Sequence, residues 1–140
     1  MSKQHQGLLT AYRATDYRVP TLALTIRIDR IHPVLDTYLR KGKYRQWCLI
    51  TADNPSSQLL SVEENIRRQQ AFRQALQAAG WSVLPARNVD TQGHWPIENS
   101  WLICDMPQED GRQWAQRYGQ LAYLYGEISQ PARLVWTKPD

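Results

Sequence analysis

Strand patterns and helix patterns alternate along this chain, and their order limits the folds that it can adopt. From residue 46 onward the order is strand, helix, strand, strand, helix, strand. This is the order of a split βαβ arrangement, so we expect an α+β fold of the ferredoxin-like sandwich type. The preceding residues predict an N-terminal helix-strand-helix extension. The alternative is a doubly wound α/β sheet, which the continuous apolar run in the strand at 46–51 favours.

The bounds of these elements follow from apolar spacing and from local start and stop signals. Ser61 and Glu64 form a capping box before the longest helix, and Gly80 stands where that helix should stop. We expect helices at 8–15, 32–40 and 61–79, and strands at 17–28, 46–51, 81–86, 99–104 and 133–136. A last helix begins after Pro107 and is expected to carry Gly111, Trp114, Ala115, Tyr118, Leu121, Ala122 and Tyr125 on one face.

Length and composition predict a single domain over residues 1–140. The chain is 42% hydrophobic and 21% charged, which is ordinary for a globular protein, and its apolar runs are too short to span a bilayer. Charged residues interrupt the only apolar stretch near the N-terminus, so no signal peptide is expected. The sequence predicts a cytoplasmic protein.

The net charge of +4 comes from scattered basic residues, and this favours a solvated surface over a nucleic-acid interface. Cys48 and Cys104 each lie inside an apolar run and are expected to be buried free thiols. The three histidines and two cysteines have no short metal-ligand spacing. We expect no metal and no cofactor.

A polar loop between the strand at 46–51 and the helix at 61–79 is the first candidate site. Thr51 and Asn54 lie in or before this loop, and Asn65 and Arg68 lie near the start of the helix. A helix N-terminus favours negative charge, so these four residues predict a site for a small anionic ligand. The other interpretation is structural: Asn54 with Pro55 starts a turn, and Asn65 hydrogen-bonds its backbone.

Glu98 is the candidate acid or base outside this loop, because the neighbouring Trp95 can make its surroundings apolar and raise its pKa. The alternative is a solvated loop glutamate. Gln120 is a further candidate ligand contact, and Gly119 before it indicates that another segment closely approaches the last helix. In a split βαβ sheet we expect Glu98 and the loop after Thr51 at opposite edges, which argues against one joint site.

Five short motifs together resemble a family of small bacterial proteins with a domain of unknown function. They are Ala11-Tyr12-Arg13-Ala14-Thr15-x-Tyr17, Ile50-Thr51-Ala52-x-Asn54-Pro55, Glu64-Asn65-x-x-Arg68, Trp95-x-x-Glu98-x-Ser100 and Tyr118-Gly119-Gln120-x-Ala122. The resemblance spans nearly the whole chain and implies one compact domain without an established activity. The family often has an aromatic residue before Asn54, where this chain has Asp53.

These observations leave three functional hypotheses. The first is binding of a small anionic or nucleotide-like ligand at the loop, with catalysis undecided. The second is a non-enzymatic module that binds a protein partner or its own copy through the alternating strand with Leu24, Ile26 and Ile28. The third and weakest is RNA binding on a ferredoxin-like sheet.

Overall fold

The computed structural model describes residues 2–138. Four α-helices and seven strands follow one another along the chain. The helices are α1 (Lys3–Arg13), α2 (Pro33–Lys41), α3 (Val62–Ala78) and α4 (Gln108–Arg117). The strands are β1 (Thr15–Val19), β2 (Leu24–Ile26), β3 (Gln46–Thr51), β4 (Val83–Asp90), β5 (Glu98–Cys104), β6 (Ala122–Glu127) and β7 (Arg133–Trp136).

All seven strands belong to one antiparallel sheet with the order β2-β1-β4-β5-β3-β6-β7. A doubly wound α/β fold needs parallel strands, so that alternative is wrong. The N-terminal segment is not an extension either, because β1 pairs directly with β4. The predicted α+β class is confirmed.

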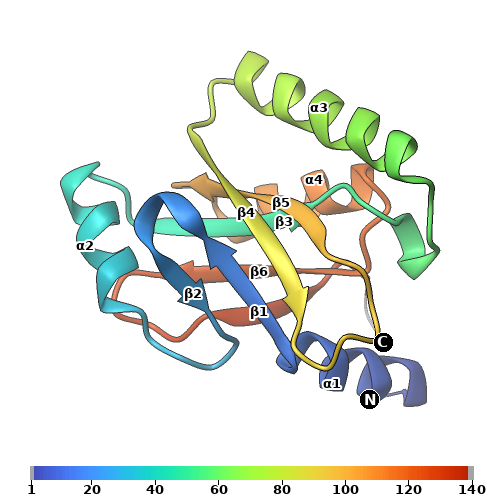
Figure 1. Cartoon of the computed structure of the whole chain (residues 1–140). Coiled ribbons are helices and arrows are strands. Elements are labelled where there is room, and N and C mark those ends of the chain that lie inside the picture. Colours follow the sequence, from blue (N-terminus) through green and yellow to red (C-terminus); the bar gives the residue numbers. More distant parts are fainter. Residues whose placement is uncertain (1, 139–140) are drawn as a thin grey trace.

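The sheet is strongly curled, like half of a barrel (Figure 1). Each of its faces carries an apolar core. On the convex face Phe72 and Leu76 of α3 and Ala115 of α4 are buried. On the concave face the core includes Leu35 and Leu39 of α2. This curled sheet of seven strands differs from the simple two-layer sandwich that we expected.

The strand predicted at 17–28 is in fact a hairpin of two strands. A short 3-10 turn at Pro20–Leu22 separates β1 from β2, and Ala23 follows in the left-handed conformation with φ 49°. Proline has no N–H for a sheet ladder and suits such a turn. The alternation of the second half is retained, since Ile26 and Ile28 are buried inside the molecule.

The last helix is shorter than predicted, because α4 ends at Arg117 and residues 122–127 form β6. Gly119, with φ 73°, ends the helix: its N–H donates to the Gln116 carbonyl, and the Gln120 N–H donates to the Ala115 carbonyl. This is a glycine C-cap of the Schellman type. The strand is central in the sheet, between β3 and β7.

The predicted strand 46–51 agrees with β3, and Ser61 accepts a hydrogen bond from the Glu64 N–H as the capping box requires. The apolar side chains of α3 are only partly buried, because Phe72 and Leu76 are inaccessible whereas Val62 and Ile66 are 70% and 48% exposed. The first two turns of α3 therefore do not cover the sheet. None of the helices described between residues 2 and 138 is long and apolar enough to cross a membrane.

Candidate functional site

A cavity of about 270 Å³ opens on the concave face of the sheet, beside the place where β3 ends and β5 begins. Strands β3, β6 and β7 supply an apolar floor, and α1 and the β4–β5 loop (residues 91–97) contribute to its sides. We call this cavity the concave pocket. Among the residues that line it are Leu8, Tyr12, Tyr17, Leu49, Thr51, Asn54, Asn88, Asp90, His94, Trp95, Glu98, Gln120, Leu124 and Leu134.

Asn54 lies in the loop after β3 and makes hydrogen bonds within this loop, to α3 and to β5. Its backbone is left-handed, with φ 48°, a conformation that asparagine adopts more readily than most residues. Its Oδ1 accepts from the Leu60 N–H at 2.9 Å and from Asn65 Nδ2 at 2.8 Å. Its Nδ2 donates to Glu98 Oε2 at 2.8 Å. Asn54 therefore connects the β3–α3 loop (residues 52–61) to the first residue of β5.

The expectation that Glu98 and the loop after Thr51 lie at opposite edges is wrong. Strands β3 and β5 are antiparallel neighbours, with Thr51 opposite Ser100, so the end of one lies beside the start of the other. Asn54 and Glu98 are consequently in direct contact. One site that includes both residues is geometrically allowed.

The Glu98 carboxylate is held through one of its two oxygens. Oε2 accepts from Asn54 Nδ2 and, at 3.1 Å, from Trp95 Nε1, whereas Oε1 accepts no hydrogen bond from residues 2–138. Burial raises the pKa of Glu98, the two hydrogen bonds oppose this, and the nearby Asp53 carboxylate raises it further. The net direction is upward, so Glu98 has the environment of a carboxyl group that can exchange a proton.

Asp53 is almost completely buried behind this carboxylate. Its Oδ2 accepts from the Asn99 N–H at 2.9 Å, while its buried Oδ1 has no partner within the described chain. Burial raises its pKa, and the Asn99 N–H and the charge of Arg68 lower it in part. Asp53 does not line the concave pocket, so its influence there is electrostatic and acts through Glu98.

Two of the predicted ligand contacts, Asn65 and Arg68, do not line the pocket. Asn65 Oδ1 accepts from the Asn54 N–H at 3.0 Å. Arg68 donates from Nε to the Ala52 carbonyl and from a terminal nitrogen to the Tyr118 carbonyl, both at 2.6 Å. Asn65 therefore hydrogen-bonds the loop backbone, as the structural interpretation expected. Arg68 joins the loop to the end of α4, a role that the sequence did not indicate.

Gln120 and Thr51 both line the pocket, but only Gln120 has a side-chain atom without a hydrogen-bond partner among the described residues. Thr51 Oγ1 donates to the Asn99 carbonyl at 2.6 Å and accepts from the Asp53 N–H at 3.0 Å. Gln120 Nε2 donates to the Asp53 carbonyl at 3.0 Å, and no donor in residues 2–138 reaches its Oε1. Gln120 therefore keeps a free acceptor and Thr51 does not.

Gly119 is approached closely, as the sequence indicated, and the approaching segment is the β3–α3 loop. A Cβ atom at Gly119 would lie 2.7 Å from Pro55 Cβ, and the Ser56 N–H donates to the Gly119 carbonyl at 2.7 Å. The loop after β3 thus packs on the C-terminal end of α4. This contact fixes the position of Gln120.

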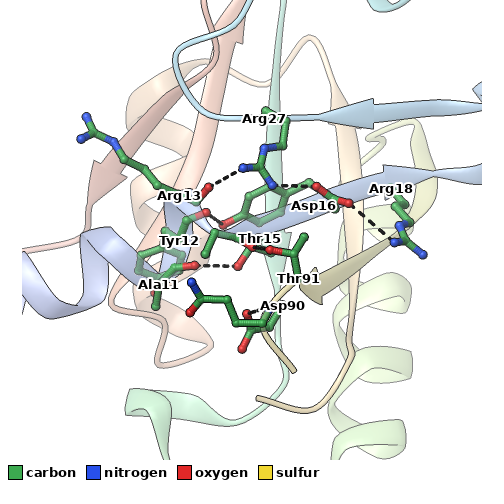
Figure 2. Close-up of polar contacts among 12 residues, drawn as sticks. Ala11, Tyr12, Arg13, Thr15, Asp16, Arg18, Arg27, Asp90 and Thr91 are labelled. Atoms are coloured by element: carbon green, nitrogen blue, oxygen red, sulfur yellow. Dashed lines mark hydrogen bonds and ion pairs between the residues drawn. The ribbon is translucent and has the colours of Figure 1, made fainter. Parts of the chain in front are cut away.

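Tyr12 of α1 is a pocket residue that the sequence reasoning did not assign to a site. Figure 2 shows the end of α1 tied to the hairpin, where Arg27 donates to the Arg13 carbonyl at 2.8 Å and to Asp16 Oδ1 at 2.7 Å. Burial and the negative charge of Glu98 raise the pKa of Tyr12. The signal that could have identified it is the first family motif, which contains Tyr12.

Comparison with known protein families identifies the chain. A family model described as a protein of unknown function, DUF3293, matches residues 50–123, which is more than half of the chain. The chain belongs to the DUF3293 family. No curated protein and no solved structure matches it.

The DUF3293 match divides the pocket into two parts. It covers Asn54, Glu98 and Gln120, which supply most of the polar contacts described above. Tyr12 lies outside the matched residues. The end of β3, strands β4 and β5 and the start of β6 therefore carry the part of the pocket that falls within the family model.

The charge of the pocket lining does not suit the anionic ligand that the sequence predicted. Within residues 2–138 the lining includes the carboxylates of Asp90 and Glu98 but no lysine or arginine, and its one basic side chain is that of His94. In the described residues no three His, Cys, Asp or Glu side chains are grouped so that they could hold a metal ion. The pocket therefore combines an apolar floor with hydrogen-bond acceptors of Glu98 and Gln120.

Proposed function

We propose that the concave pocket of this DUF3293 protein binds a small organic molecule with an apolar part and at least one hydrogen-bond donor. The observation that carries the proposal is that Glu98 Oε1 and Gln120 Oε1 lack partners within residues 2–138 while both side chains line one cavity. An apolar pocket with a few convergent polar groups is the usual form of a small-molecule site.

The structure of the loop supports this proposal. The side-chain amides of Asn54 and Asn65 hydrogen-bond one another, Glu98 and the backbone, so they fix the conformation of the loop beside the pocket. Preorganised acceptors lower the entropic cost of binding. The raised pKa of Glu98 also makes proton transfer to or from a bound molecule a reasonable second role for this residue.

A ligand screen with an occlusion variant tests the proposal. Ala11 lies at the pocket on the exposed side of α1, so Ala11→Trp adds bulk there without disturbing the core. Ala78→Trp places the same side chain at an exposed position at the end of α3, away from the pocket. We expect compounds that raise the melting temperature of the wild type and of Ala78→Trp, and bind Ala11→Trp about tenfold or more weakly. Compounds that bind both variants equally would contradict the proposal.

A second candidate function is contact with another protein, at a surface other than the one predicted. The burial of Ile26 and Ile28 argues against the strand that we expected to provide it. Leu59, Val62 and Ile66 are instead 62%, 70% and 48% exposed around the start of α3. If the protein self-associates through these residues, light scattering should show a dimer, and Val62→Glu should abolish it. A monomeric wild type would contradict self-association.

RNA binding has no support in the pocket lining, which contains no lysine or arginine among the described residues.

A further inference from the structure

The concave pocket has two free hydrogen-bond acceptors, Gln120 Oε1 and Glu98 Oε1. The hydrogen bonds made by the other polar atom of each side chain determine how these two oxygens are oriented. Gln120 Nε2 donates to the carbonyl oxygens of Asp53 and Tyr118, at 3.0 and 3.3 Å. Because both neighbours are acceptors, the amide cannot be turned over, and Oε1 must be the atom directed away from them. Gln120 is only 8% exposed and lines the pocket, and its Oε1 has no donor among the described residues.

Glu98 presents the second acceptor in a similar way. Asn54 and Trp95 occupy Oε2, and both of these donors are neutral groups. Arg68, whose charge acts on the neighbouring Asp53, directs its guanidinium to the carbonyl oxygens of Ala52 and Tyr118 instead. The Glu98 carboxylate therefore lies in the pocket without a positively charged partner among residues 2–138.

The other carboxylate of the lining cannot play the same role. Asp90 accepts from the backbone N–H groups of Gln92, His94 and Trp95, at 2.9, 2.9 and 3.0 Å. These bonds shape the β4–β5 loop and place Trp95 against Glu98. Glu98 is consequently the carboxylate that a ligand can use.

A carboxylate without a cationic partner and an amide oxygen without a donor line the same pocket, and together they favour a hydrogen-bond donor that also carries positive charge. We propose that the ligand presents a cationic nitrogen, a protonated amine or an amidinium group, to Glu98 Oε1 and Gln120 Oε1. Its hydrocarbon part would pack on the floor formed by Leu49, Leu124 and Leu134, beside the ring of Tyr12. Aromatic walls add to the binding of such cations. This inference rests on the proposed small-molecule function and names its ligand class.

Three probes of one shape but different charge test this assignment: benzylamine, benzyl alcohol and benzoate. Their dissociation constants for the full chain are measured by protein NMR at pH 7 and low salt. Benzylamine should bind about tenfold or more tightly than benzyl alcohol, and benzoate should be weakest, because a charge-assisted hydrogen bond is about twice as strong as a neutral one. Equal binding of the amine and the alcohol, or tighter binding of benzoate, would overturn the cation assignment.

Variants locate the effect at Glu98. Glu98→Gln keeps an oxygen that can accept hydrogen bonds from Asn54 and Trp95, so this variant should fold. It should lose the preference for the amine. Its affinity for the alcohol should stay within about twofold of the wild type. Gln120→Ala should weaken the amine severalfold. Glu127→Gln, a change at an exposed strand position outside the pocket, is the matched control and should leave all three affinities unchanged. An amine preference that survives Glu98→Gln would also overturn the assignment.

The outcomes separate this inference from the proposed function. If neutral compounds bind and Ala11→Trp blocks them, the pocket is a ligand site and only the cation assignment fails. If no probe binds and the wider screen also yields no compound sensitive to Ala11→Trp, both proposals fail together.

Discussion

The Asn54 side chain uses nearly all of its hydrogen-bonding capacity at one point of the structure. It donates to Glu98, accepts from Leu60 and Asn65, and its own backbone N–H donates to Asn65. An alanine there would retain the backbone bond alone and would still have to adopt the left-handed conformation. The loop conformation therefore depends on this residue type.

Asn54→Ala should lower the free energy of unfolding by about 2–4 kcal/mol, because buried partners are left without hydrogen bonds. Urea denaturation measures this change. Asn99→Ala is the matched control: Asn99 lies nearby on β5, its side chain is exposed, and it makes no side-chain hydrogen bond in residues 2–138. The control should stay within about 0.5 kcal/mol of the wild type. Similar losses for both variants would contradict the role given to Asn54.

Glu98→Gln tests the carboxyl environment through the pH dependence of stability. Since the pKa of Glu98 is raised in the folded state, its contribution to stability is fully present below the unfolded pKa of about 4.3 and is lost as pH rises through the folded pKa. Glutamine stays neutral throughout. The stability of Glu98→Gln relative to the wild type should therefore increase from pH 4 to pH 8.

Urea melts of both proteins at several pH values measure this difference. Asp53 is present in both proteins, but its negative charge opposes the ionisation of Glu98, which only the wild type has. Asp53 therefore adds to the expected loss of wild-type stability at high pH. Glu127→Gln serves again as the exposed control and should show no such increase. A difference that is constant or shrinks with pH would mean that Glu98 is not held in this environment.

At the scale of elements, local signals predicted some segments well and misassigned others. The capping box places the start of α3 correctly, and β3 has the predicted bounds, because both signals lie in adjacent residues. Residues 118–125 also fit helical spacing, but they contain the C-cap glycine and then β6. The pairing of β6 with β3 and β7 selects the strand there, and such pairing cannot be read from apolar spacing.

Three glycine-to-alanine variants separate the effects of conformation and packing at the end of α4. Gly7→Ala, in α1 with open space around it, should stabilise the protein by about 0.5–1 kcal/mol. Gly93→Ala has open space but φ 71°, so it should cost about 1 kcal/mol. Gly119→Ala has φ 73° and also meets Pro55, so it should cost clearly more than Gly93→Ala. Thermal and urea denaturation measure the three values, and equal costs at Gly93 and Gly119 would show that the contact with Pro55 is unimportant.

Helix α1 should open more easily than the sheet that it covers. It has no buried residue, whereas five of the six residues of β3 are buried. Backbone amides of α1 should exchange with deuterium at least about tenfold faster than those of β3, since local opening costs less free energy where little apolar surface is buried. A compound bound in the concave pocket should slow the exchange in α1. Equal protection of α1 and β3 in the free protein would contradict this prediction.

At the scale of the whole molecule, both cysteines are buried. Cys48 and Cys104 are free thiols, 0% and 2% exposed, and burial raises the pKa of each. A thiol reagent should therefore react with neither in native buffer within minutes and with both in urea. Rapid labelling of one thiol in the native state would show that its core opens without global unfolding.

Neighbouring residues alone determined the cap at Ser61 and the buried strand at 46–51, because these depend on contacts within a few positions. The sequence also indicated Glu98 and Gln120 one by one. Their assembly depends on sheet order: β5 pairs with β3, α4 ends against the β3–α3 loop, and the curl of seven strands brings α1 over the same end. Those contacts join residues more than 40 positions apart, such as Asn54 and Glu98, and no local pattern encodes them.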